Sequence, residues 1–176
     1  MITLQEDLTD QNYCDFVELS EQTSDAFSVL IRYPKGIERQ RANPTEWEQE
    51  YHEYFETMSV WQHKMEPFLL KSRHDSQWAA GISYDRNFYF TINYYRFCKQ
   101  TLSYVLEPKS LFRWNGPTYP EDICFFREGE CWMSCCSHER FAVITSANPL
   151  VETFVEQKVR CIKEDDADLA PYYEKY

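Results

Sequence analysis

The feature that most constrains this fold is a stretch of strand-forming residues, 119–144, that polar turns interrupt twice. Apolar, aromatic and β-branched residues predict three strands, at 123–126, 131–136 and 141–145. The segments between them are short and contain glycine, serine and charged residues, as turns do. Strands joined by such short connections run antiparallel. This stretch therefore predicts a compact antiparallel meander in the C-terminal part of the chain.

A long amphipathic helix is the second strong signal. Asn43 suits the N-cap position and Pro44 the first helical position. Large apolar residues then recur at steps of four and three, which places them on one stripe of a helix: Trp47, Tyr51, Tyr54, Met58, Trp61, Met65 and Phe68. Pro67 is expected to kink or end this helix. We interpret the stripe as core-facing.

The remaining segments predict a mixture of strands and shorter helices. Helices are expected at 10–19, 97–107 and 148–158, a buried strand at 26–33, and a hairpin of strands from 78–84 and 88–95. A further strand is the alternative for 148–158. Because helices and strands do not alternate regularly, we predict the α+β class: an antiparallel sheet of about five or six strands with a C-terminal meander, and one long amphipathic helix packed on one face.

The length of 176 residues predicts one domain. We assign residues 1–163 to a single α+β domain and 164–176 to an acidic tail, which is expected to be mobile unless a partner orders it. No apolar run is long enough to span a bilayer, and the N-terminus lacks the features of an export signal. The odd number of cysteines, seven, is typical of reduced thiols, so we expect a cytoplasmic protein.

Charge is the composition feature that bears most on function. The chain has 18 basic and 29 acidic residues, a net charge of −11. Such a charge disfavours binding to nucleic-acid phosphates or to anionic membranes. It favours a basic protein partner, although solubility alone is an equal explanation.

The predicted meander contains candidate metal ligands. Cys131, Cys135, Cys136 and His138 lie within eight residues. On a regular strand Cys131 and Cys135 point to the same face but stand about 13 Å apart, too far to share one zinc ion. Cys136 points to the other face. We therefore predict no metal and no cofactor, and interpret the cysteines as buried thiols.

A thiol enzyme is an alternative. Cys135 or Cys136 beside His138 would pair a nucleophile with a base, and Glu139 or Asp122 would orient the imidazole. The set for this alternative, a thiol enzyme or small hydrolase, is Cys136, His138 and Asp122. The chain has no G-x-G-x-x-G, P-loop, G-x-S-x-G or H-E-x-x-H motif. We therefore predict that the chain is not an enzyme.

The run Tyr119-Pro-Glu-Asp-Ile-Cys-Phe through Trp132 to Ser137-His-Glu139 resembles a family of small bacterial proteins. Their shared pattern is Pro-Glu-Asp-Leu-Cys-Phe, Trp, Ser-His-Glu, and they are loosely labelled stage III sporulation protein AH-like. The resemblance extends more weakly over residues 78–114. It implies no activity for named residues, and an immunity-type role is compatible with it. The motif residues would shape a hairpin, with Gly129 in its turn and Trp132 packing it.

These observations favour a non-enzymatic protein-binding module. The most specific form of this hypothesis is an acidic immunity, antitoxin or defence-related inhibitor that masks a basic toxin or effector. A scaffold or adaptor unrelated to toxins is the other alternative. The predicted binding surface combines acidic residues of the long helix, two tyrosines and the acidic tail: Glu48, Glu50, Glu53, Glu56, Tyr89, Tyr95, Glu164, Asp165, Asp166 and Asp168.

Overall fold

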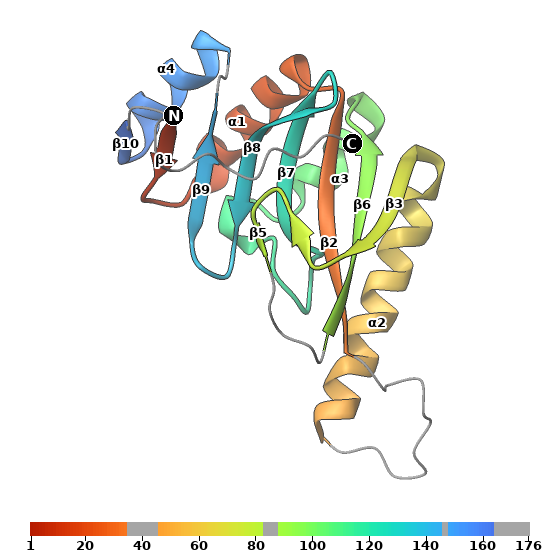
Figure 1. Ribbon diagram of the computed structural model, residues 1–176. Coiled ribbons are helices and arrows are strands. Elements are labelled where there is room, and N and C mark those ends of the chain that lie inside the picture. Colours follow the sequence, from red (N-terminus) through yellow and green to blue (C-terminus); the bar gives the residue numbers. More distant parts are fainter. Residues whose placement is uncertain (35–45, 83–87, 146–147, 164–176) are drawn as a thin grey trace.

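The computed structural model describes residues 1–34, 46–82, 88–145 and 148–163. Its centre is an eight-stranded antiparallel sheet with the order β10-β1-β9-β8-β7-β2-β6-β3 (Figure 1). The strands are β1 (Ile2–Leu4), β2 (Ala26–Pro34), β3 (Leu69–Asp75), β6 (Phe88–Arg96), β7 (Glu121–Arg127), β8 (Glu130–Cys136), β9 (Phe141–Ile144) and β10 (Cys161–Lys163). A separate small hairpin pairs β4 (Gln77–Trp78) with β5 (Gly81–Ile82).

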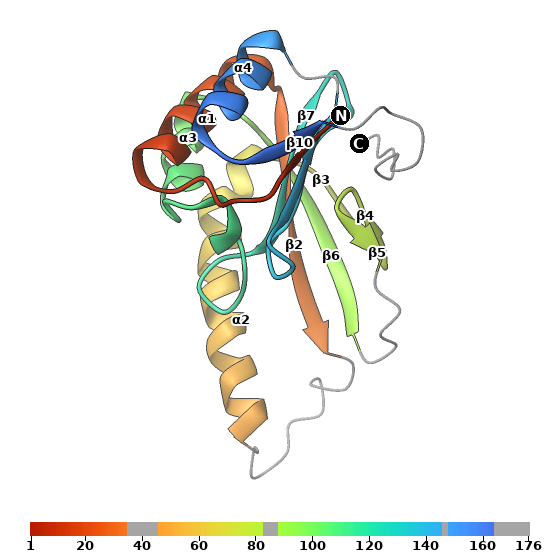
Figure 2. The same ribbon diagram turned by 90° about the vertical axis from the view of Figure 1, so that its left-hand side faces the viewer.

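Helices cover one face of the sheet and the small hairpin covers part of the other (Figure 2). The helices are α1 (Asp10–Thr23), α2 (Glu46–Met65), α3 (Lys99–Leu106) and α4 (Pro149–Lys158), with short 3₁₀ turns η1 (Glu66–Phe68) and η2 (Leu111–Arg113). Strand alternation sends successive side chains to opposite faces, so the central strands need apolar residues on both sides. The sheet therefore separates two cores.

The larger core lies between the sheet and the helices. Phe125 of β7 is fully buried there and stacks on Phe97, with ring centroids 5.1 Å apart and an interplanar angle of 12°. Trp132 of β8 and Phe16 of α1 lie 5.9 and 6.2 Å from the same ring. Offset aromatic contacts of this kind add to the free energy gained by burial. One phenylalanine thus connects two strands and a helix.

The smaller core lies under the β4–β5 hairpin. Trp78 of the hairpin packs on Phe90 of β6, with ring centroids 5.5 Å apart. Tyr94 and Phe126 form an edge contact beside them, and Cys124 and Cys131 lie in the same cluster. The hairpin shields part of the sheet face that the helices leave uncovered.

The prediction of a five- or six-stranded sheet with one long helix is wrong, although the fold is α+β. The sequence analysis missed β1 and β10, which are three residues long and too short for an alternation pattern. It also missed β3, because an edge strand with exposed side chains has a polar sequence. The predicted hairpin partner of β6 at 78–84 was wrong, since β6 pairs with β2 and β3. Three shorter helices share the sheet face with α2.

Other predictions are confirmed. The meander β7-β8-β9 has the predicted order, with the two-residue turn Glu128-Gly129 at positive φ (53° and 83°). The stripe of α2 is buried at Tyr54, Met58 and Trp61. The helix expected at 148–158 is α4 (Pro149–Lys158), and its N-cap Asn148 accepts from the backbone N–H of Leu150.

Some predictions lie outside the described residues. They are the helix start at Asn43 and Pro44, the side chain of Trp47, and the tail 164–176. Within the described part of the chain, no helix combines the length and the apolar character needed to cross a bilayer.

Candidate functional site

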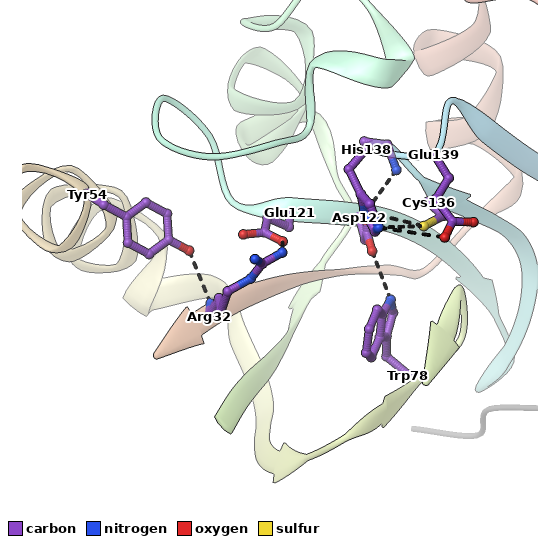
Figure 3. Close-up of polar contacts among 9 residues, drawn as sticks. Arg32, Tyr54, Trp78, Glu121, Asp122, Cys136, His138 and Glu139 are labelled. Atoms are coloured by element: carbon purple, nitrogen blue, oxygen red, sulfur yellow. Dashed lines mark hydrogen bonds and ion pairs between the residues drawn. The ribbon is translucent and has the colours of Figure 1, made fainter. Parts of the chain in front are cut away.

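Two acidic side chains at the start of β7 are buried and point to different polar sites (Figure 3). Glu121 is 6% exposed and Asp122 is 2% exposed. The pairing of β2 with β7 is irregular between Ser28 and Leu30, and Asp122 has a φ of 56°, the left-handed region that non-glycine residues rarely adopt. Glu121 pairs with Arg32 and Asp122 accepts from Trp78, so the two consecutive carboxylates lie in separate environments.

Asp122 lies in a cluster with Cys136 and His138. Its Oδ1 accepts from the backbone N–H of Ser137 at 2.8 Å, and its Oδ2 accepts from Trp78 Nε1 at 3.1 Å. Cys136 Sγ lies 3.5 Å from His138 Nδ1. One ligand atom from each of Asp122, Cys136 and His138 lies within 4.8 Å of the other two. The structure thus brings together the three residues that the sequence named for the enzyme alternative.

Strand register produces this cluster. Cys124 pairs with Ser134 across β7 and β8, so Asp122, two residues earlier, faces Cys136, two residues later. The turn after β8 returns His138 to Cys136. Sequence reasoning did not find Trp78, which lies 44 residues from Asp122 and has no local signal that predicts the contact.

One step of the cysteine prediction is wrong. Cys131 and Cys135 do not share a face, because β8 has a bulge at Trp132, where the pairing of Phe125 and Phe126 shifts register. Cys131 packs in the core under the hairpin, and Cys135 packs in the helix-side core. The extra residue reverses the alternation between the two thiols.

The environment of Cys136 does not favour a thiolate nucleophile. Burial raises its pKa to about 12, and the carboxylates of Asp122 and Glu139 add to the increase. The thiolate, not the thiol, is the nucleophile, so activation requires the opposite shift. The three residues are therefore assembled, but Cys136 stays protonated at neutral pH unless a cation stabilises its thiolate.

The stability of the metal-free protein should depend on Asp122. Burial raises the pKa of this carboxyl from 3.8 to about 7, and the charge of Glu121 adds to the increase. The native state keeps the Asp122 proton where the unfolded chain has lost it. This contribution is complete below pH 3.8 and is lost as the pH rises through 7. We expect the unfolding free energy to fall by up to about 4 kcal/mol over this range.

Urea unfolding at several pH values, with a chelator present, measures this dependence. In Asp122→Asn the unfolding free energy should depend much less on pH. His138→Gln is the control, because it changes a neighbouring side chain of the same cluster and leaves the Asp122 carboxyl in place. If the unfolding free energy of Asp122→Asn fell with pH as steeply as that of the wild-type protein, another titrating group would cause the dependence.

A second candidate site consists of two depressions along α2. The first has a volume of about 550 Å³, and Tyr51, Glu53 and Tyr54 line it together with Arg32 and Glu121. Arg32 donates to Glu121 Oε2 at 2.8 Å, and the Tyr54 hydroxyl accepts from the Arg32 backbone N–H at 3.1 Å. These contacts join β2, β7 and α2 (Figure 3), and all three residues line the depression.

The second depression has a volume of about 370 Å³. Its lining includes Glu56, Trp61 and Lys64 of α2, Glu107 at the end of α3, and Tyr119. Each depression therefore contains two carboxylates, one cation and at least two aromatic side chains.

Glu53 and Glu56 are exposed, so they are available as the predicted binding surface. Tyr95 was predicted as an anchor, and this is wrong: it is 1% exposed, because it faces the helices and packs on Trp61 at 5.2 Å. The side chains of Glu48, Glu50 and Tyr89 lie outside the described residues. The same holds for Glu164, Asp165, Asp166 and Asp168. The sequence analysis did not propose Tyr51, Glu107 or Tyr119 for binding.

Comparison of the chain with protein-family models, with curated proteins and with solved structures found no match. The resemblance to the sporulation protein AH-like family therefore stays a prediction.

Proposed function

We propose that this chain is a non-enzymatic, cytoplasmic protein-binding module that masks a basic partner, in the manner of an immunity protein or antitoxin. The observation that carries the proposal is the pair of depressions along α2, where carboxylates and aromatic rings lie together. A net charge of −11 supports a basic partner. The sporulation protein AH-like resemblance is compatible with this role.

The two depressions suit long basic side chains. An arginine or lysine from the partner would pair with Glu53 or Glu56 at the surface. Its aliphatic part would pack beside Tyr51 and Tyr54, or beside Tyr119, where a cation over a ring is also favourable. Several such contacts on one helix would give an interface with a defined register, and the overall negative charge would speed association.

A short arginine-rich peptide is the probe for this surface. We expect Glu53→Gln/Glu56→Gln to weaken binding of the labelled peptide by about five- to tenfold, because two ion pairs are lost. Fluorescence anisotropy measures the affinity, and amide chemical shifts should locate the peptide on α2. Binding should also weaken as salt is added.

The matched control is Glu18→Gln/Glu128→Gln, which removes the same charge from two exposed positions on α1 and on the β7–β8 turn. Equal weakening in both double variants would show that only net charge matters and would reject the α2 surface. The activity of the partner, measured with and without this chain, distinguishes an adaptor from an inhibitor. An adaptor would bind its partner without lowering the partner's activity.

A further inference from the structure

We propose that Asp122, Cys136 and His138 form a binding site for one zinc-class transition-metal ion. The site is separate from the α2 depressions and does not depend on the proposed partner. Its ligands differ from the cysteine-rich set that the sequence analysis considered, because Asp122 of the neighbouring strand β7 takes the place of Cys131 and Cys135.

The distances fit this ion. Zinc binds sulfur at about 2.3 Å and imidazole nitrogen at about 2.0–2.1 Å, so tetrahedral geometry separates these two atoms by about 3.5 Å. Cys136 Sγ lies 3.5 Å from His138 Nδ1 and 3.9 Å from Nε2, so the separation from Nδ1 fits but the imidazole must rotate to point that nitrogen at the ion. One Asp122 carboxylate oxygen lies within 4.8 Å of Cys136 Sγ and of one ring nitrogen of His138. Closing the set requires the imidazole to turn and to approach the other two ligands, which His138 can do because its side chain is 45% exposed.

The surrounding groups already orient the ligands. Trp78 Nε1 and the Ser137 N–H each donate to one oxygen of Asp122. When a metal ion displaces the proton of this carboxyl, each oxygen keeps a lone pair for the metal. Glu139 Oε1 lies 3.9 Å from His138 Nε2, so it can hold this nitrogen when Nδ1 binds the ion. A carboxylate near the distal nitrogen of a metal-binding histidine is a common outer-shell arrangement. Asp122 and Cys136 therefore stand in position before any ion binds.

The ligand types select the class of ion. One sulfur, one nitrogen and one carboxylate oxygen suit zinc or cobalt, whereas calcium and magnesium require oxygen ligands. Three protein ligands leave a fourth position of a tetrahedron open, and the exposed side chain of His138 places the site near solvent. The open position would hold water.

Cobalt(II) titration of the reduced, metal-free full-length protein tests the site. We expect one ion per chain, a thiolate-to-cobalt charge-transfer band, strong visible bands typical of tetrahedral cobalt, and displacement of the cobalt by zinc. Cys136→Ser should abolish the charge-transfer band, and His138→Gln should weaken binding at least tenfold. His138 is on an exposed turn, so this variant tests the site even if Asp122→Asn fails to fold.

Cys131→Ser is the matched control, because Cys131 and Cys124 form another group of thiols under the hairpin. It should leave the cobalt spectrum unchanged. Loss of the band in Cys131→Ser but not in Cys136→Ser would place the metal elsewhere and overturn the proposal. Absence of a thiolate band in the wild-type protein, or equal binding by His138→Gln, would also overturn it.

Discussion

Replacing Phe125 by alanine should lower the unfolding free energy by about 3–5 kcal/mol, the usual cost of removing a buried aromatic ring. Phe125 is fully buried at the centre of the sheet. Its ring contacts Phe97, Trp132 and Phe16. These neighbours come from separate elements, so they cannot collapse together into the space that the ring leaves. Urea unfolding should show a lower midpoint with an unchanged slope.

Phe141→Ala is the control for this prediction. Phe141 lies in the same meander but is 37% exposed. Its loss should cost about 1 kcal/mol or less, because little buried area is removed. If both variants lost the same unfolding free energy, the prediction that the buried Phe125 ring stabilises the fold more than the exposed Phe141 ring would be wrong.

Tyr13→Phe should cost about 2–4 kcal/mol, because it leaves two buried polar groups without a partner. The Tyr13 hydroxyl donates to the Val105 carbonyl oxygen at 2.6 Å and accepts from Trp114 Nε1 at 2.9 Å. Both Tyr13 and Trp114 are fully buried. Burial raises the pKa of Tyr13 far above its ordinary value, so the hydroxyl keeps its proton and remains a donor. This one oxygen links α1 with α3 and with the segment before β7.

A double-mutant cycle with Trp114→Phe isolates the contact. The two substitutions should cost less together than the sum of the single costs, because each removes the same hydrogen bond. Tyr104→Phe, at a half-buried tyrosine of α3, is the matched hydroxyl deletion and should cost less than 1 kcal/mol. Strict additivity of the two substitutions would mean that the contact contributes little.

Local patterns predicted the elements whose signals are contained in their own residues. The α2 stripe, with Met58 and Trp61 at helical spacing, is buried as expected. The helix expected at 148–158 forms as α4, with Pro149 at its first position. The turn at Gly129 separates β7 from β8 as expected. In each case the signal lies within a short segment of the sequence, so residue propensity and apolar periodicity are enough to predict the element.

Side-chain environment was harder to predict. Tyr95 was assigned to a solvent-facing side of its strand, but the helices cover that side. The sequence of β6 shows which residues share a face, and it does not show what packs on that face. Cys131 and Cys135 were misplaced for a related reason, since a one-residue bulge reverses the alternation without any change in composition.

The three residues of the metal-site candidate were named from the sequence only as the set for the thiol-enzyme alternative, and no metal was predicted. Cys136 and His138 are close in sequence, and Asp122 becomes their neighbour through the register of β7 and β8. Trp78 donates a hydrogen bond to Asp122 although the two residues are 44 positions apart in the sequence. Such long-range contacts depend on the whole sheet.

The sequence by itself determined the meander, the long helix, the acid charge and the residue types at both candidate sites, because these depend on local preference and composition. Only the tertiary structure decided the eight-strand order, the burial of Tyr95, the meeting of Asp122 with Cys136 and the depressions beside Glu53 and Glu56. The physical reason is that pairing register and layer packing are set by contacts between residues distant in the chain, whose free energies no local pattern contains.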